Sequence, residues 1–158
     1  MAHARPDADT TVGAWTSTGA TLYEVVDEVS ADDGDYIAIV STQDTCELRL
    51  SDVTDPVSSS GHVLRIRRKS TAGGYVLTYN LRQGSTSIKT ASVGLSFGGF
   101  FTTLEVTLSG AEADSITDYT DLNIQLNGKY AQVSWIEFEV PSLQGATPQQ
   151  LQYRLRRI

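Results

Sequence analysis

The sequence has one cysteine, Cys46, and two histidines, His3 and His62, among its 158 residues. A single cysteine excludes an intrachain disulfide and a zinc site built from several thiolates. A hydrolase nucleophile needs a base beside it, yet no Gly-x-Ser-x-Gly motif accompanies the histidines. We interpret His62 as a loop or strand-end residue and Cys46 as a small buried hydrophobic side chain. We therefore expect no catalytic residues and no enzymatic activity.

Long apolar runs are also missing. No segment approaches the roughly 20 apolar residues of a membrane-spanning helix, and residues 1–11 lack the apolar stretch of a signal peptide. No Walker A loop or dinucleotide-binding fingerprint occurs, and Gly94, Gly98 and Gly99 lack the strand–loop–helix context of a phosphate-binding loop. We expect a soluble protein that is made in the cytoplasm and binds neither a cofactor nor a membrane.

Basic residues are scarce in the first part of the chain. Residues 1–60 contain twelve acids against Arg5 and Arg49, whereas residues 61–158 contain ten basic residues against seven acids. The net charge of −7 argues against general nucleic-acid binding. The asymmetry would let identical copies, or a larger partner, meet with opposite charges across a contact. Solvated surface charge is the alternative interpretation.

The pattern that is present is that of β-strands. A chain of this length and 40% hydrophobic content predicts one domain with its own core. Apolar and polar residues alternate in five stretches separated by glycine or proline turns, at 36–40, 47–50, 64–67, 75–82 and 103–108. Helical periodicity is nearly absent. The sequence therefore predicts an all-β, two-sheet antiparallel sandwich of jelly-roll type.

Three local motifs refine this prediction. Asn127-Gly128 is typical of a type I′ hairpin turn, which would place Ile124 opposite Ala131. The apolar phase then changes near Trp135-Ile136, which indicates a bulge or a strand that crosses between sheets. Ser109 followed by Glu112 is a capping box, so we expect one short connecting helix near residues 109–117.

The two ends differ from the body of the chain. Residues 1–10 are polar without a periodic pattern, and we expect an N-terminal arm there, with the sandwich domain spanning residues 11–141. Residues 142–158 form a second arm or tail, in which Leu151, Tyr153 and Leu155 alternate with arginines. Such a segment is suited to lie across a neighbouring subunit. A frayed tail is equally compatible with the pattern.

Two acidic groups are candidate sites. Asp27, Glu28, Asp32, Asp33 and Asp35 crowd one stretch, and oxygen ligands close together are what calcium requires. Asp32, Asp33 and Asp35 are the calcium candidates, with turn formation and solvated acids as the default interpretation. Glu137 and Glu139 share one strand face and have the spacing of a glycosidase carboxylate pair. Alternation with buried residues explains them more simply as an outer face.

Aromatic residues give the best candidate contact patch. Most of them fall on the core side of their strands, but Phe97, Phe100 and Phe101 lie in a glycine-flanked stretch that fits a loop tip. Exposed, these rings would form a contact patch for a protein neighbour. The alternative is a hairpin packed under the sheet.

The chain resembles small structural proteins of tailed bacteriophages over residues 6–141. The resemblance is carried by Trp15, by Asp35-Tyr36-Ile37, and by the segments 107–122 (with Glu112-Ala113 and Ile116-Thr117-Asp118-Tyr119) and 133–141 (Val-Ser-Trp-Ile-Glu-Phe-Glu-Val-Pro). It implies a jelly-roll-like virion component on the capsid surface, a decoration or cement protein that assembles as a trimer and binds the major capsid protein. Phe97, Phe100, Phe101, Tyr153, Arg154, Arg156 and Arg157 are then the expected partner-binding residues.

The same kind of module also occurs among tail and fibre accessory proteins. A receptor- or carbohydrate-binding β-sandwich is therefore the alternative, and it predicts exposed aromatics near one end of the sandwich. A calcium-dependent adhesion domain is a third hypothesis, which predicts that calcium raises the melting temperature.

Overall fold

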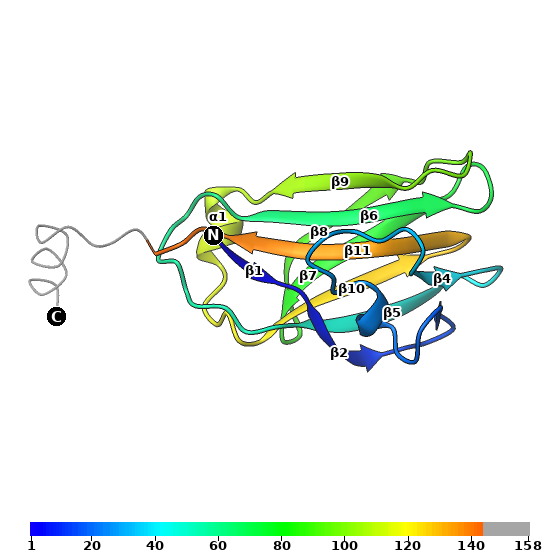
Figure 1. Ribbon diagram of the computed structural model, residues 1–158. Coiled ribbons are helices and arrows are strands. Elements are labelled where there is room, and N and C mark those ends of the chain that lie inside the picture. The colour runs from blue at the N-terminus through cyan, green and yellow to red at the C-terminus, as the bar shows by residue number, and fades with distance from the viewer. Residues whose placement is uncertain (144–158) are drawn as a thin grey trace, which may run out of the picture.

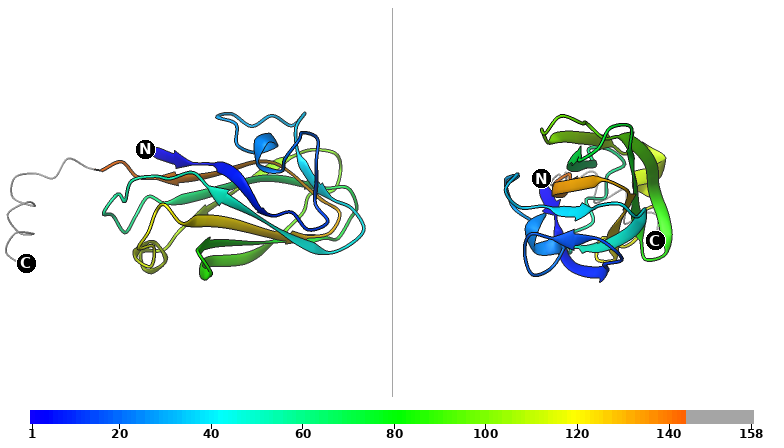
Figure 2. Two further views of the ribbon diagram at one scale, coloured as in Figure 1. Left: turned by 90° about the horizontal axis from the view of Figure 1, so that it is seen from below. Right: turned by 90° about the vertical axis from the view of Figure 1, so that its right-hand side faces the viewer.

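The computed structural model describes residues 1–143, which form two antiparallel β-sheets packed face to face (Figures 1 and 2). The first sheet contains β1 (Ala2–Ala4), β3 (Thr16–Ser17), β4 (Ile37–Ile39), β6 (Val63–Ser70), β9 (Thr102–Thr107) and β11 (Ala131–Val140). The second contains β2 (Pro6–Thr11), β5 (Asp44–Leu50), β7 (Val76–Gln83), β8 (Thr86–Gly94) and β10 (Leu122–Gly128). A 3-10 turn, η1 (Tyr23–Val25), and one helix, α1 (Gly110–Asp114), lie on the connections. The predicted all-β, two-sheet sandwich is confirmed.

Strand order shows how the chain alternates between the sheets. The first sheet runs β3-β4-β11-β6-β9, with β1 paired to the last residues of β11, and the second runs β2-β5-β10-β7-β8. Strands β9 and β8 are therefore edge strands. The core lies between the sheets and contains large side chains with no exposed surface, including Leu48, Ile66, Leu81, Leu122, Ile124, Ile136 and Phe138.

The predicted phase change is confirmed as a bulge in β11. The pairing of β11 with β6 shifts between Val133 and Trp135, so Ser134 is the extra residue. Val133 on one side of the bulge and Ile136 on the other are both fully buried. A bulge re-aims the side chains that follow it, which is how opposite sequence parities reach the same core.

The predicted hairpin at Asn127-Gly128 is wrong. Strands β10 and β11 do not pair with each other, because the chain crosses there from the second sheet to the first. Gly128 is a strand residue, and a Cβ on it would lie 3.2 Å from Leu77 and 3.3 Å from Ala131, so its small size serves close packing. The left-handed backbone (φ 52°) falls on Tyr130 instead.

Residues 2–11 also differ from the expected arm. β1 pairs antiparallel with β11, and β2 pairs with β5, so the start of the chain belongs to both sheets. Because the pairing is through the backbone, the polar composition of this segment did not reveal it. The expected tail of residues 142–158 lies outside the described residues from 144 onward.

The connecting helix begins as predicted. Ser109 accepts a hydrogen bond from the Glu112 amide, and the Glu112 side chain accepts one from the Ser109 amide, which completes the capping box. The helix ends at Asp114 rather than near 117. Within residues 1–143, no helix is long and apolar enough to cross a membrane.

Gly13 provides a test of the turn that leads from β2 to β3. Its φ is +57°, and an added Cβ would lie 2.5 Å from the Thr45 carbonyl oxygen, whereas Gly74 (φ +81°) has no atom within 4 Å. We expect Gly74→Ala to lower the free energy of unfolding by about 1 kcal/mol through backbone strain. Gly13→Ala should lower it by at least about 1 kcal/mol more, because the carbonyl must move. Urea unfolding measures both, and equal losses would contradict the proposed clash.

Candidate functional site

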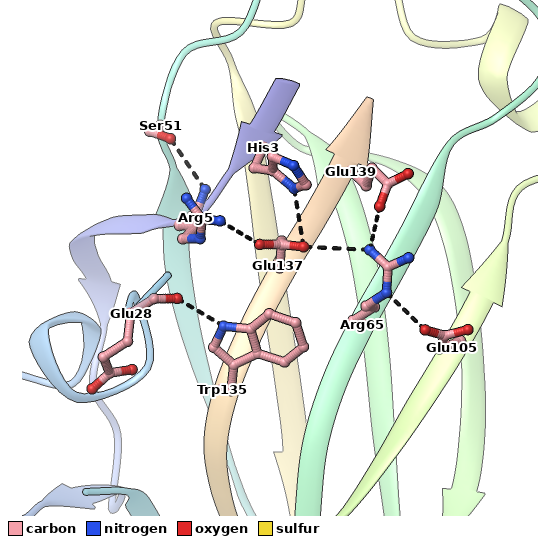
Figure 3. A network of polar contacts seen from close by, with 9 residues as sticks. All are labelled: His3, Arg5, Glu28, Ser51, Arg65, Glu105, Trp135, Glu137 and Glu139. Carbon is pink, nitrogen blue, oxygen red and sulfur yellow. Dashed lines mark hydrogen bonds and ion pairs between the residues drawn. The ribbon is translucent and has the colours of Figure 1, made fainter. Parts of the chain in front are cut away.

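Three features of the described chain have the chemistry of a site: an ionic cluster on the first sheet, an open groove at one end, and an aromatic patch at the other. The ionic cluster centres on Glu137 of β11, whose side chain is only 5% exposed (Figure 3). Arg5 Nη2 donates to Glu137 Oε2 at 2.5 Å, and Arg65 Nη1 donates to Glu137 Oε1 at 3.3 Å. The buried carboxylate therefore has a cation on each side.

Arg65 of β6 extends the cluster across the sheet. Its Nη1 donates to Glu139 at 2.6 Å and its Nε to Glu105 of β9 at 2.8 Å (Figure 3). These hydrogen bonds raise the pKa of Arg65 above its usual value, with Glu105 the largest cause. The cluster thus links three neighbouring strands, β11, β6 and β9, and joins them to Arg5, which follows β1.

Glu137 lies on the outer face of its sheet, as expected, but it is not exposed to solvent. The side chain points away from the core, but β1 lies alongside β11 and brings Arg5 and His3 against it (Figure 3). The alternation of the sequence around Glu137 predicts which face of the sheet the side chain lies on, but it does not predict which segment covers that face. Glu137 is therefore buried and ion-paired rather than solvated.

His3, Glu137 and Glu139 form the group whose geometry could hold a metal ion, since one ligand atom from each lies within 4.8 Å of the others. Arg5 and Arg65 already neutralise these carboxylates, and a cation placed there would face two guanidinium groups. While Glu137 and Glu139 are paired with arginine, neither is available as the general acid or the nucleophile that glycoside cleavage requires. We interpret the cluster as a clamp that holds β1 on the sheet.

The calcium candidates Asp32, Asp33 and Asp35 each bond to protein groups, as the default interpretation expects. Asp33 accepts two hydrogen bonds from Arg67 at 2.6 Å and one from Ser134 at 2.9 Å. Asp32 accepts from the Gly34 amide, and Asp35 accepts from the Thr18 hydroxyl. Each carboxylate has a different partner, and among the described residues these three acids do not form a group with metal-binding geometry. Hydrogen bonding to Arg67 lowers the pKa of Asp33 below its usual value of 3.8.

An open groove of about 410 Å³ lies at the end of the sandwich that carries α1. Residues 52–55 and 117–120 line it. Its acids are already bonded: Asp52 accepts from Arg49 at 2.5 Å, and Asp118 accepts from the amide and hydroxyl of Thr120. Asp55, the third acid of the groove, accepts from the Val57 amide, so all three carboxylates take part in local hydrogen bonds.

The remaining titratable candidates are structural. His62 is fully buried just before β6, and its Nε2 lies 2.8 Å from the Tyr119 hydroxyl. Burial lowers the pKa of His62 and raises that of Tyr119 to about 12, so both are neutral at neutral pH. Cys46 is buried as predicted, and burial raises the pKa of its thiol. A reactive cysteine needs a lowered pKa.

The aromatic patch lies at the opposite end, where the loops after β6, β8 and β10 meet (right-hand end in Figure 1). We call it the aromatic end and define it by Tyr75, Phe97, Phe100, Phe101 and Tyr130. Phe97 is 66% exposed and Phe100 is 80% exposed, whereas Phe101 is buried. Gly98 and Gly99 between them have positive φ angles, a conformation that presents both rings at the loop tip.

Backbone hydrogen bonds hold the three loops together. Ser70 N donates to Ser96 O at 2.9 Å, Thr71 N to Tyr130 O at 2.9 Å, and Leu95 N to Tyr75 O at 3.0 Å. The rings of Tyr75 and Tyr130 lie 4.7 Å apart. Because each loop is hydrogen-bonded to another, the loop that carries the exposed rings is held in place by its neighbours.

Two lysines accompany these rings. The ammonium of Lys69 lies 4.4 Å from the centre of the Phe101 ring, and Tyr36 packs on the same ring at 6.2 Å. The ammonium of Lys129 lies 5.4 Å from the Tyr130 ring and 6.0 Å from the Tyr75 ring. The aromatic end therefore combines apolar faces with cationic hydrogen-bond donors.

The predicted contact residues differ in their exposure to solvent. It exposes Phe97 and Phe100 and buries Phe101, so the alternative of packing under the sheet holds for one ring of the three. Tyr153, Arg154, Arg156 and Arg157 lie outside the described residues. Sequence reasoning did not select Tyr130, Lys69 or Lys129. The Gly73-Gly74 turn beside Tyr75 was the available signal, but the meeting of three loops is a property of the tertiary structure.

Comparison with known proteins identifies the fold. No protein-family model and no curated protein matches the sequence. Among solved structures, the chain is similar to the C-terminal CBM6 of LamC, a marine laminarinase from Zobellia galactanivorans, with a TM-score of 0.54 and 12% identity over 88% of this chain and 98% of that one. It also matches a carbohydrate-binding module of Cellvibrio mixtus lichenase 5A, with a TM-score of 0.48 and 13% identity over 89% and 97%. At this identity the likeness to the LamC module shows a shared β-sandwich fold.

The clamp on β1 can be tested by Glu137→Gln. Removing the buried charge leaves Arg5 without its carboxylate partner, and we expect the free energy of unfolding to fall by about 2–3 kcal/mol. Glu105→Gln is the matched control, because it removes an ion pair with the same Arg65 at a side chain that is 63% exposed, and it should cost less than about 1 kcal/mol. Urea unfolding of both variants is the measurement. Equal losses would contradict the clamp.

The Asp33–Arg67 pair predicts a pH dependence. Because the pKa of Asp33 is lower in the folded state, the pair stabilises the fold above the unfolded-state pKa and this contribution is lost as the pH falls below about 4. We expect Asp33→Asn and Arg67→Gln to reduce the acid-side slope of the free energy of unfolding by similar amounts. Denaturation at pH 3 to 6 measures it, and unchanged slopes in both variants would refute the assignment.

Proposed function

We propose that this protein is a non-catalytic, carbohydrate-binding β-sandwich module whose glycan site is the aromatic end. The observation that carries the proposal is the exposure of Phe97 and Phe100 on one supported loop tip. A single exposed apolar side chain is common at a protein surface, but exposed aromatic rings grouped on one loop form an apolar patch, and such patches commonly mark a binding surface. The apolar C–H face of a sugar ring packs on an aromatic ring, while its hydroxyls need polar neighbours.

Polar groups of the required kind lie beside the rings. The hydroxyls of Ser96 and Thr102 are 3.2 Å apart at the two ends of the loop that carries the phenylalanines. Lys69 adds a further donor. Apolar faces with a few placed polar groups are the usual composition of a small-ligand site. The fold likeness to the LamC module, which is a CBM6, supports the same class of function.

The capsid-decoration hypothesis stays a prediction. It rests on the sequence resemblance to phage virion proteins, and four of its seven contact residues lie beyond the described chain. A carbohydrate-binding module on a phage tail or fibre would agree with both the resemblance and the aromatic end. Homotrimer formation and the major capsid protein as partner likewise stay predictions.

A glycan-array screen followed by calorimetry tests the proposal. Once a glycan is found, we expect Phe97→Ala and Phe100→Ala each to weaken binding about tenfold or more, because each removes a stacking face worth at least about 1.4 kcal/mol. Val29→Ala is the control, since Val29 is 78% exposed on a different loop and should bind as the wild type does. All three positions are at the surface, so melting temperatures should stay unchanged. Wild-type affinity in both phenylalanine variants would refute the proposed site.

A further inference from the structure

The aromatic end is also where uncompensated positive charge gathers. Residues 1–143 contain nineteen acids and nine basic residues, and six of the nine basic residues form ion pairs. Arg5, Arg49, Arg65, Arg67, Arg82 and Lys89 each form an ion pair. Within this part of the chain, Lys69 and Lys129 form none, and Arg68 bonds only to Thr102. In an acidic protein, two lysines left without a carboxylate partner are an exception.

Both lysines adjoin the supported loops: Lys69 lies near the end of β6, and Lys129 lies between β10 and β11. Lys69 precedes Ser70, which bonds to Ser96 and bridges to Phe97. Lys129 precedes Tyr130, whose carbonyl oxygen accepts from Thr71. The backbones that carry the two lysines are thus held by the same group of loops that carries the exposed rings.

No acid occurs in the segments that build this end, residues 69–76, 93–103 and 128–136. Two acids lie beside these segments. Asp33 bonds to Ser134 and interacts electrostatically with Lys69, but both of its oxygens are already bonded to Arg67. Asp44 lies opposite Gly128 in the strand pairing. Its carboxylate already accepts the Ala14 amide at 2.7 Å and the Thr45 amide at 2.8 Å. Neither lysine forms an ion pair within residues 1–143, and each lies over an aromatic ring. A cation over a ring keeps its N–H donors available to a ligand.

We infer that the glycan bound at the aromatic end is anionic, carrying carboxylate or sulfate groups that pair with Lys69 and Lys129. This inference rests on the proposed glycan-binding function and names its ligand class. A charge-assisted hydrogen bond from an ammonium group to an anionic oxygen is about twice as strong as a neutral one. A neutral glycan would leave both cations without a partner in the complex.

The test uses the full chain and three probes: oligogalacturonate, its methyl ester, and a sulfated galactan. The methyl ester keeps the sugar ring and removes only the charge, so we expect it to bind about tenfold more weakly than the acid. Lys69→Gln and Lys129→Gln should each weaken binding of the acidic glycan by a similar factor. Lys89→Gln is the matched control, because Lys89 is paired with Glu112 away from this end, and it should bind as the wild type does.

Each result has a defined meaning. Preference for either acidic glycan supports the inference, and the sulfated galactan distinguishes sulfate from carboxylate as the recognised group. Equal binding of acid and methyl ester, or unchanged binding in both lysine variants, overturns the inference while a glycan site at Phe97 and Phe100 survives. Failure to bind any glycan, neutral or acidic, overturns the proposed function and the inference together.

Discussion

The register of β11 is the constraint on which the rest of the sandwich depends. This strand is central in its sheet: it pairs with β6 along most of its length, with β4 at its beginning and with β1 at its end. The bulge at Ser134 lets Val133 and Ile136 enter the same core, and it turns Glu137 toward the outer side of the sheet. A slip of one residue would exchange the buried and outward-facing side chains. The ionic cluster around Glu137 opposes such a slip, because its arginines come from neighbouring segments.

The clamp and the aromatic end have different physical roles. Arginines in the clamp are satisfied by carboxylates, so they stabilise the start of the chain and leave little free charge for a ligand. At the aromatic end the balance is reversed, since rings are exposed and lysines lack acidic partners. A site that binds a ligand must keep some interactions unsatisfied until the ligand arrives. By that criterion the aromatic end, rather than the ionic cluster, fits the binding surface that we propose.

Local patterns predicted the local features of the fold well. The capping box at Ser109 and Glu112 and the phase change after Val133 depend only on neighbouring residues, and the structure has both. The Asn127-Gly128 turn failed because its residues are compatible with two environments. In this chain Gly128 is needed for close packing against Leu77, and that need comes from a strand fifty residues away. The burial of Glu137 was not predicted for the same reason, since His3 and Arg5, which lie against it, come from the first residues of the chain.

By itself, the sequence determined the class of fold, the single core and the short helix, because alternation and capping act over a few residues. It indicated a loop tip at residues 97–101 but did not determine which of the three phenylalanines is exposed. The tertiary structure decided which sheet each strand joins, that residues 2–11 belong to both sheets, and that Lys69, Lys129 and Tyr130 meet the phenylalanines at one end. Those outcomes depend on contacts between segments far apart in the chain. Hydrogen bonds between such strands join any backbone to any other, so side-chain patterns carry little record of the pairing.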